Sequence, residues 1–144
     1  MKDLKFKLIN PLEHQEKILL LLKQLNPNRD NNYLNKTLLD MAKLSSYRCF
    51  ALFNNKELIG ISSGWTTIRV YSGKHLELDN VIIDAEIQSK GYGKWFITKI
   101  EKWTKEQAYN CIGLNTYTQN ARSHKFYFNQ GFKILGFHFE KQLS

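Results

Sequence analysis

Between residues 11 and 44 the apolar positions recur every three or four residues, which predicts two amphipathic helices, at about 11–25 and 30–44. The first helix has a clear start, because Asn10 is a good cap and Pro11 suits the first helical position. The segment "NPN" at 26–28 ends it.

Beyond residue 47 the period shortens toward two, which is typical of strands. Strands are expected at 48–53, 57–70, 75–83, 111–116 and 132–143, a long helix at about 91–109, and a short helix at 120–131 capped by Gly131. With a first strand before residue 11, the order is β-α-α-β-β-β-α-β-α-β. This order predicts an α/β (α+β) fold, a mixed central sheet flanked by helices in a single domain over 1–144. The strand–helix–strand step from 83 to 111 predicts two parallel strands.

The composition is that of an ordinary globular protein, with 42% hydrophobic residues. No apolar run approaches the roughly 18–20 residues of a membrane helix, and the N-terminus lacks a signal-peptide core. A cytoplasmic protein without a membrane partner is therefore expected. Cys49 and Cys111 are expected to be buried free thiols, and no His or Cys pair has the spacing of metal ligands, so no metal site is predicted.

A net charge of +8 suits an anionic partner such as nucleic acid, an acidic protein or a phosphate-rich cofactor. The lysines are dispersed along the chain, so the charge alone does not choose among these partners.

The segment "QSKGYG" (88–93) stands where a strand gives way to a helix, and it predicts an anion site. The first turn of a helix leaves N–H groups unpaired and carries partial positive charge. Gly91 and Gly93 let a ligand approach the backbone, while Lys90 and Lys94 add charge. A pyrophosphate fits this chemistry. A Walker loop is absent, and Phe96 occupies the position of the third Rossmann glycine.

Two segments together resemble a known family. "QSKGYG" is similar to the Q/R-x-x-G-x-G/A signature of the GNAT superfamily of acyl-CoA-dependent N-acyltransferases. "NARSHKFYFNQGF" (120–132) is similar to its later motif N-x-x-A-x-x-[FL]-Y-x-x-x-G-F, departing from it at Ser123, where alanine is usual. The chain thus resembles a compact single-domain N-acetyltransferase, and the resemblance implies acetyl-CoA as co-substrate.

The resemblance also implies roles for individual residues. The strand end would offer backbone groups to the pantetheine arm, the glycine loop would surround the pyrophosphate, and Asn120 would contact the cofactor near the pantetheine. The residues concerned are Val81, Ile82 and Ile83 for the arm, and Gln88, Ser89, Lys90, Gly91, Tyr92, Gly93 and Lys94 for the pyrophosphate. A backbone N–H near Ile83 would hold the oxyanion.

Tyr127 is the candidate proton donor. Acetyl transfer to an amine releases a thiolate of pKa ~8.5, which a phenol of pKa ~10 can protonate or hydrogen-bond. The alternative is that Tyr127 is only a core aromatic beside Phe126 and Phe128.

Glu77 is the candidate base that removes a proton from the amine. It lies eleven residues before Gln88, which resembles the position of the catalytic glutamate in the histone-acetylating branch of the family. Asp79 shares its strand face. Two alternatives stay open: a solvated strand carboxylate at Glu77, or a water wire as the base.

The acceptor side is the least determined. Tyr33, Trp65 and Tyr71 lie on elements that frame the acceptor pocket in relatives. A net charge of +8 disfavours polycationic acceptors, which favours a small-molecule amine or a protein/peptide amine. Attack is expected to be direct, in a ternary complex, because no cysteine stands where an acyl carrier would. Aminoacyl-tRNA acetylation, a non-catalytic CoA- or nucleic-acid-binding module and a homodimer remain alternatives.

Overall fold

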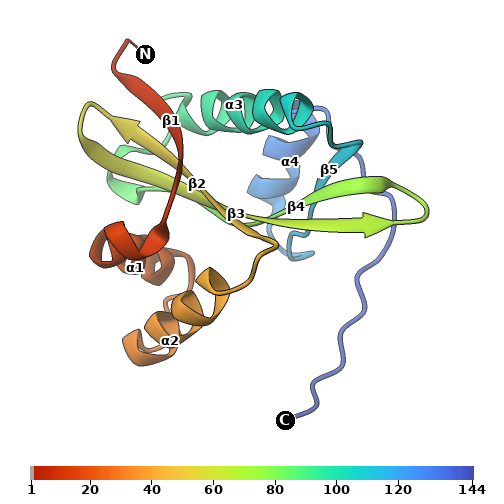
Figure 1. The fold of residues 1–144 in the computed structure, drawn as a ribbon, viewed down its shortest axis with the longest axis horizontal. Coiled ribbons are helices and arrows are strands. Elements are labelled where there is room, and N and C mark those ends of the chain that lie inside the picture. The colour runs from red at the N-terminus through yellow and green to blue at the C-terminus, as the bar shows by residue number, and fades with distance from the viewer. Residues whose placement is uncertain (1) are drawn as a thin grey trace.

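A computed structural model describes residues 2–144. One sheet of five strands, in the order β1-β2-β3-β4-β5, forms the centre of the molecule. Helices α1 and α2 cover one face, and α3 lies on the other with α4 nearby (Figure 1). The elements are β1 (Leu4–Ile9), η1 (Pro11–His14), α1 (Gln15–Leu25), α2 (Asn31–Ala42), β2 (Tyr47–Asn54), β3 (Glu57–Arg69), β4 (Gly73–Ile83), η2 (Ala85–Ile87), α3 (Tyr92–Glu106), β5 (Cys111–Leu114) and α4 (Ala121–Asn129).

The predicted mixed sheet is confirmed. Strands β1 to β4 run antiparallel in chain order, whereas β4 and β5 run parallel, as the predicted crossover through α3 requires. The parallel ladder is short: it begins at the pair His75–Cys111 and ends at the pair Leu78–Leu114.

Each face of the sheet has its own apolar core. Residues of α1 and α2, such as Leu21 and Leu38, pack on one face, while Phe96 and Ile100 of α3 pack on the other. Phe50 of the inner strand β2 is fully buried. Burying each such side chain contributes about 1.5–3 kcal/mol, so these contacts hold the helices on the sheet.

Two helix boundaries differ from the prediction by three residues or more. The segment after Asn10 begins as the 3-10 turn η1, and the α-helix starts only at Gln15, because the non-helical backbone of His14 separates the two. The helix predicted to reach 109 ends at Glu106, where Ala108 adopts a left-handed φ of 60°.

The strand predicted at 132–143 does not form. Beyond Phe132 the chain is extended and exposed, and it runs away from the body to the C-terminus (Figure 1). Its apolar side chains are between 71 and 92% exposed: Ile134, Leu135, Phe137, Phe139 and Leu143. The prediction was wrong because apolar residues supply only the tendency to form a strand, and a strand also needs a neighbouring edge to pair with.

Strand β4 carries a bulge that the sequence did not reveal. Asp79 pairs with Ser63 and Ile82 pairs with Ile61, so β4 has one residue more than β3 between these two pairs. Asn80 lies inside the bulge, with a left-handed φ of 50°. A bulge bends a strand and redirects its side chains, and this one lies just beyond the last pair with β5.

Candidate active site

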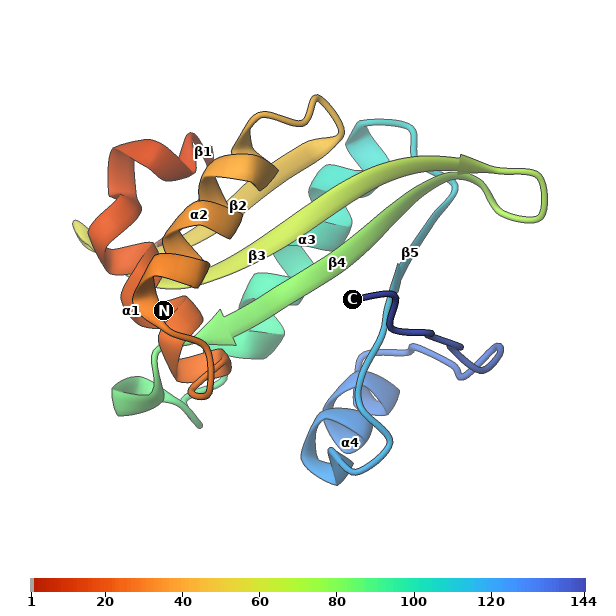
Figure 2. The same ribbon diagram turned by 90° about the horizontal axis from the view of Figure 1, so that it is seen from below.

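The main feature of the site is an opening between β4 and β5. Pairing stops at Leu78 and Leu114, after which β5 gives way to a loop that leads toward α4 while β4 continues (Figure 2). Within the part of the chain that the structure describes, residues 79–83 therefore have no strand partner on that side. The Val81 and Ile83 side chains contact the core under α3, and that of Ile82 belongs to the core under α1. The open edge thus presents main-chain groups.

The loop after β4 closes back on the strand and then opens α3. Gln88 Nε2 donates a hydrogen bond to the Ile83 carbonyl over 2.9 Å. Ser89 and Gly91 have left-handed φ values of 69° and 78°, and no side chain caps α3. The N–H groups of Tyr92, Gly93 and Lys94 in the first helical turn are left for a partner outside the helix. Free N–H groups at the positive end of a helix are the arrangement that an anion requires.

Positive side chains gather around this loop. Lys90 and Lys94 are exposed, and Arg122 of α4 reaches back to donate from Nη2 to Ser89 Oγ over 3.4 Å. Three cationic side chains and the positive end of a helix make the loop a place where a doubly charged anion is stabilised. The Arg122 contact comes from α4 and so adds to the charge that the glycine motif itself carries.

The two sequence motifs are in contact. Gly93, the second glycine of the loop, faces the ring of Phe126 in α4, so the absence of a side chain lets α4 approach the first turn of α3. Asn120, at the start of α4, accepts a hydrogen bond from Ser123 N over 3.1 Å and so caps the helix. Asn120 is exposed, and its amide NH₂ faces no hydrogen-bond acceptor among residues 2–144.

Tyr127 packs between two aromatic rings, with centroids 5.1 Å from Phe126 and 5.5 Å from Phe132. Burial raises the pKa of Tyr127 to about 12. The phenol therefore keeps its proton at any physiological pH. The residue is a packed aromatic, as one reading of the sequence had it, and it also retains a hydroxyl that can donate.

Glu77 is not a solvated strand carboxylate. Its Oε2 lies 2.8 Å from His75 Nε2, and its Oε1 accepts a hydrogen bond from Asn115 Nδ2 over 3.0 Å. Its side chain is only 20% exposed. Glu77 pairs with Trp65 across the β3–β4 ladder, so both side chains lie on the α1–α2 face of the sheet.

The three acceptor-side candidates are not brought together. Trp65 lies beside Glu77 and packs on Tyr47 at 5.0 Å between ring centroids. Tyr71 lies in the β3–β4 turn, where it is 79% exposed and bonds through its hydroxyl to Arg69. Tyr33 lies on α2 under the guanidinium of Arg29. Only Trp65 stands next to the predicted base.

An ion pair that the sequence reading missed anchors the end of β4. Lys17 Nζ lies 2.7 Å from Asp84 Oδ2, and Gln24 Nε2 donates to Oδ1 over 3.2 Å. Gln24 also accepts from the Ala85 N–H. The hydrogen bond from Lys17 holds the pKa of Asp84 below its ordinary value. These contacts tie α1 to the start of the glycine loop.

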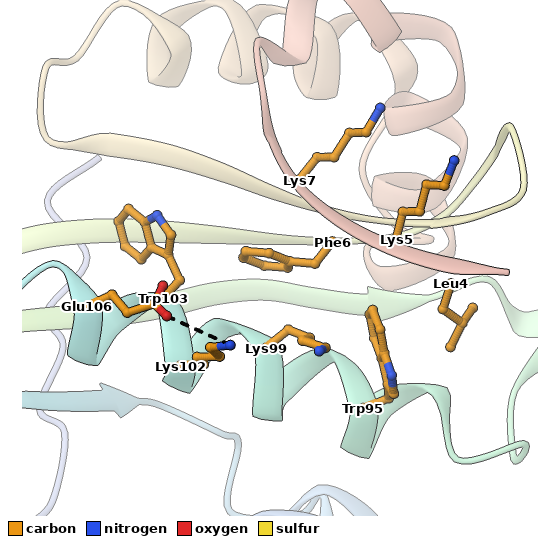
Figure 3. A pocket seen from close by; sticks show the side chains of 9 residues that line it. All are labelled: Leu4, Lys5, Phe6, Lys7, Trp95, Lys99, Lys102, Trp103 and Glu106. Atoms are coloured by element: carbon orange, nitrogen blue, oxygen red, sulfur yellow. Dashed lines mark ion pairs between the residues drawn. The ribbon is translucent and has the colours of Figure 1, made fainter. Parts of the chain in front are cut away.

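A second hollow, of about 510 Å³, lies far from this opening, between β1 and α3 (Figure 3). Several lysines line it, but Lys5 and Lys7 point to the other side of β1. Lys102 Nζ lies 3.9 Å from Glu106 Oε1 and is paired with it. Lys99 Nζ lies above the ring of Trp95, 5.0 Å from its centroid. This open groove therefore lacks converging donors for an anion, unlike the turn at Gly91.

Two further predicted features concern the cysteines and the membrane. Cys49 is buried, as predicted, but Cys111 is only partly buried, which corrects the expectation for that residue. Among residues 2–144 no three His, Cys, Asp or Glu side chains are grouped as metal ligands. In the same range, no helix has the length and apolar character needed to cross a bilayer.

Comparison with known proteins agrees with this geometry. The model of the acetyltransferase (GNAT) family matches residues 16–132. An uncharacterized N-acetyltransferase, YhdJ of Bacillus subtilis (strain 168), is 28% identical over 97 residues, which are 67% of this chain and 68% of that protein.

Solved structures share the fold. The aminoglycoside N-acetyltransferase AAC(6')-Iy in complex with CoA superposes with a TM-score of 0.81 at 16% identity, over 98% of this chain and 95% of the other. A GNAT family acetyltransferase of Staphylococcus aureus subsp. aureus USA300_TCH1516 superposes with a TM-score of 0.78 at 22% identity, over 98% and 99%. The open edge of β4, the glycine turn of α3 and a family match over most of the sequence lead to one assignment: this chain belongs to the acetyltransferase (GNAT) family.

Proposed function

We propose that this chain is an N-acetyltransferase that transfers the acetyl group of acetyl-CoA to the primary amine of a small molecule or of a protein or peptide, by direct attack in a ternary complex. Its family makes acetyl-CoA the donor and an amine the acceptor. The single observation that carries the assignment of the site is the unpaired edge of β4 beside the uncapped first turn of α3.

The donor side is built mainly from main-chain groups. Val81, Ile82 and Ile83 are proposed to line the pantetheine arm, which adds to the unpaired side of β4 as an extended chain would. The loop 88–94 takes the pyrophosphate on its N–H groups, with the cations of Lys90, Lys94 and Arg122 around it. The free amide of Asn120 is the proposed contact from α4. Acetyl-CoA, when bound there, supplies the activated thioester.

Tyr127 is proposed to stabilise the departing thiolate as a hydrogen-bond donor. Complete proton transfer from a phenol of pKa about 12 to a thiolate of pKa about 8.5 is uphill by about 5 kcal/mol. A hydrogen bond needs no such transfer and is strong toward an anion. The raised pKa of Tyr127 thus favours donation of a hydrogen bond over delivery of the proton.

Glu77 is proposed to take the proton from the acceptor ammonium, directly or through one water. Each carboxylate oxygen holds two lone pairs, and one protein hydrogen bond to each leaves others available. The bonds from His75 and Asn115 fix the carboxylate in place, and positioning is what a general base needs first. Trp65, opposite Glu77, forms the neighbouring wall for the acceptor.

The acceptor class follows from charge. With +8 overall, the chain repels polycations, so a monoamine or a peptide amino group is favoured over an aminoglycoside. The second candidate, aminoacyl-tRNA, is favoured by the same net charge. Structural relatives include an enzyme solved with sisomicin and a ribosomal-protein-alanine N-acetyltransferase of Brucella melitensis, so this fold occurs among enzymes for small and for protein acceptors.

Calorimetry with acetyl-CoA, CoA and adenosine tests the donor site. We expect both thioester and free CoA to bind and adenosine to bind much more weakly, because adenosine lacks the groups that meet the loop and the strand edge. No heat with CoA at millimolar concentration would reject the site. A thiol-release screen across amino acids, monoamines, polyamines, peptides and aminoacyl-tRNA then identifies the acceptor.

We also propose that the protein is a cytoplasmic homodimer. Two free thiols suit a reducing compartment. The apolar side chains of residues 133–144 find no cover among residues 2–144, and a second copy offers an equal segment and an equal sheet edge for reciprocal pairing.

A further inference from the structure

A cysteine, a histidine and a carboxylate form a continuous hydrogen-bonded row across β4 and β5. His75 is the register partner of Cys111, and its Nδ1 lies 2.9 Å from Cys111 Sγ. On the other side of the ring, His75 Nε2 lies 2.8 Å from Glu77 Oε2. Asn115 Nδ2 holds the remaining oxygen of Glu77 at 3.0 Å. The proposed acetyl transfer uses Glu77 but has no role for the thiol.

The row fixes which ring nitrogen carries the proton. A carboxylate only accepts hydrogen bonds, so His75 Nε2 donates to Glu77 and the lone pair of Nδ1 faces the thiol. Two acceptors lie within reach of the Cys111 thiol: His75 Nδ1 at 2.9 Å, whose ring is oriented by the Glu77 carboxylate, and the Ser72 carbonyl at 3.6 Å. A nucleophile within reach of a base that a third group orients is the general pattern of an activated side chain.

Two neighbouring residues define the space around the His75 ring: Gly113 leaves room for the imidazole, and Thr67 places a hydroxyl beside it. A Cβ at Gly113 would lie 2.8 Å from His75 Cε1 and Nε2, so any side chain there would displace the imidazole. Thr67 is the register partner of His75 on β3, and its Oγ1 is a buried side-chain oxygen without a hydrogen-bond partner in residues 2–144. A buried hydroxyl without a partner beside the row is a place for a polar atom of an incoming group.

We propose that Cys111 is a reactive thiol, with His75 as its base, and that it is a modification site for small disulfides and similar soft electrophiles. His75 Nδ1 takes the thiol proton, and the thiolate attacks one sulfur of a disulfide RS–SR. The S–S bond of the reagent breaks, a Cys111–S–SR bond forms, and the released RS⁻ takes the proton from His75. Cys111 is oxidised and the reagent is reduced, so the step is a thiol–disulfide exchange.

Modification has a consequence for acetyl transfer, and this part rests on the proposed function. The adduct would sit against His75, which holds Glu77, and Glu77 is the proposed base. Cys111 is partly exposed on the last strand of the sheet, so a small reagent reaches it without opening the core. Modification is therefore expected to lower acetyl transfer reversibly.

The test compares the two cysteines of one protein. The folded full chain is treated at pH 7 with iodoacetamide or with the aromatic disulfide DTNB, and each cysteine is followed by peptide mass spectrometry. Cys49 is the internal control, because it is 3% exposed and burial raises the pKa of its thiol to about 11. We expect Cys111 to react about tenfold faster than N-acetylcysteine and Cys49 not to react. A Cys111 rate at or below that of N-acetylcysteine overturns the proposal.

His75→Asn tests the base, and Cys49 reports whether the variant is folded. We expect the Cys111 rate to fall at least tenfold while Cys49 stays protected. An unchanged rate in a folded variant overturns the role of His75. If Cys49 becomes reactive, the variant has unfolded, and Gly113→Ala serves instead, since it displaces the ring without removing it. In a protected Gly113→Ala chain the same tenfold fall is expected, and an unchanged rate again contradicts the role of His75.

Acetyl transfer gives the second readout. A small disulfide should inhibit acetyl transfer by the parent protein, and a reductant should restore the activity. The Cys111→Ser variant should resist inhibition by the disulfide. Equal inhibition of Cys111→Ser overturns the link to transfer. The labelling result does not depend on any acetyltransferase activity, so failure of the proposed function and failure of this site are distinguishable.

Discussion

Gly93 lies so close to Phe126 that a Cβ built at position 93 would be 3.4 Å from two carbons of the ring. This contact joins the glycine loop at the start of α3 to the Asn120–Phe132 motif on α4. The glycine thus has a packing role in addition to leaving the backbone open to an anion. The contact is a physical reason why the glycine loop and the Asn120–Phe132 motif, far apart in sequence, occur in one site.

Gly93→Leu is expected to destabilise the fold by about 1–3 kcal/mol, because the larger side chain overpacks the α3–α4 contact. Affinity for CoA should fall as well, since α4 would be displaced from the loop. Urea unfolding and calorimetry measure the two effects. Gly93→Ala is the matched control and should cost less, as a 3.4 Å contact is tight but not a clash. Equal stability of the leucine variant and the parent would contradict the packing role.

Tyr127→Phe is expected to reduce kcat about 100-fold, the cost of one lost hydrogen-bond donor to a developing anion. Affinity for acetyl-CoA should stay the same, because the phenyl ring keeps its packing on Phe126 and Phe132. With a phenol pKa of about 12, Tyr127 stays protonated below about pH 11, so it should cause no decline in rate between pH 6 and 10. Steady-state rates and calorimetry check this, and an unchanged kcat removes Tyr127 from the mechanism.

Glu77→Gln is expected to lower kcat/KM at pH 7 by about 100-fold or more, because an amide cannot accept the ammonium proton. The side chain keeps its size, so binding of acetyl-CoA should not change. The measurement is a pH–rate profile of both proteins with the acceptor found in the screen. A variant whose rate and profile match the parent would assign the proton to a water wire. Asp79→Asn, on the same strand face, is the matched control and should have little effect on the rate.

Asp84→Asn is expected to destabilise the fold by about 1.5–3 kcal/mol at pH 7, since it removes a partly buried charged hydrogen bond to Lys17. The folded-state pKa of Asp84 lies below its unfolded value. Its stabilisation is therefore fully present above pH ~4–5 and is lost as pH falls through the folded-state pKa. Urea unfolding at pH 7, 5 and 3 should show the two proteins converging in acid. A constant difference at all three values would contradict the ion pair.

Removal of residues 133–144 tests the proposed dimer. We expect the parent to sediment as a dimer at micromolar concentration and the shortened chain to sediment as a monomer, because the apolar side chains of the segment would no longer be present. The melting temperature of the shortened chain should not depend on its concentration, whereas that of the parent should rise with concentration. A parent that is monomeric at every concentration tested contradicts the proposal.

The sequence predicted what depends on local pattern. The turn at Gly91 follows from glycines at the start of an apolar-periodic helix, and the parallel pairing of β4 with β5 follows from the crossover between them. The mixed sheet with helices on both faces was also predictable from element order. These features depend on neighbours in the chain or on general rules of connection.

What the sequence did not reveal depends on contacts between distant residues. Asn115 reaches Glu77 from beyond β5, and Lys17 contacts Asp84 across 67 positions. The bulge at Asn80 belongs to the register between β3 and β4, which no pattern within β4 records. In the segment after Phe132 the sequence pattern predicts a strand, but the segment pairs with no sheet edge among residues 2–144.

The unpaired flank of β4 presents main-chain groups, so binding of the donor and choice of the acceptor are expected to depend on different parts of the molecule. Every amino acid except proline contributes the same main-chain amide and carbonyl. Substitutions at Val81 or Ile83 that preserve the core are therefore expected to leave the binding of acetyl-CoA unchanged. In the proposed site, selectivity for the acceptor is expected to depend instead on side chains such as Trp65. A protein engineer can therefore randomise that wall in search of new amines while the thioester-binding half stays unaltered.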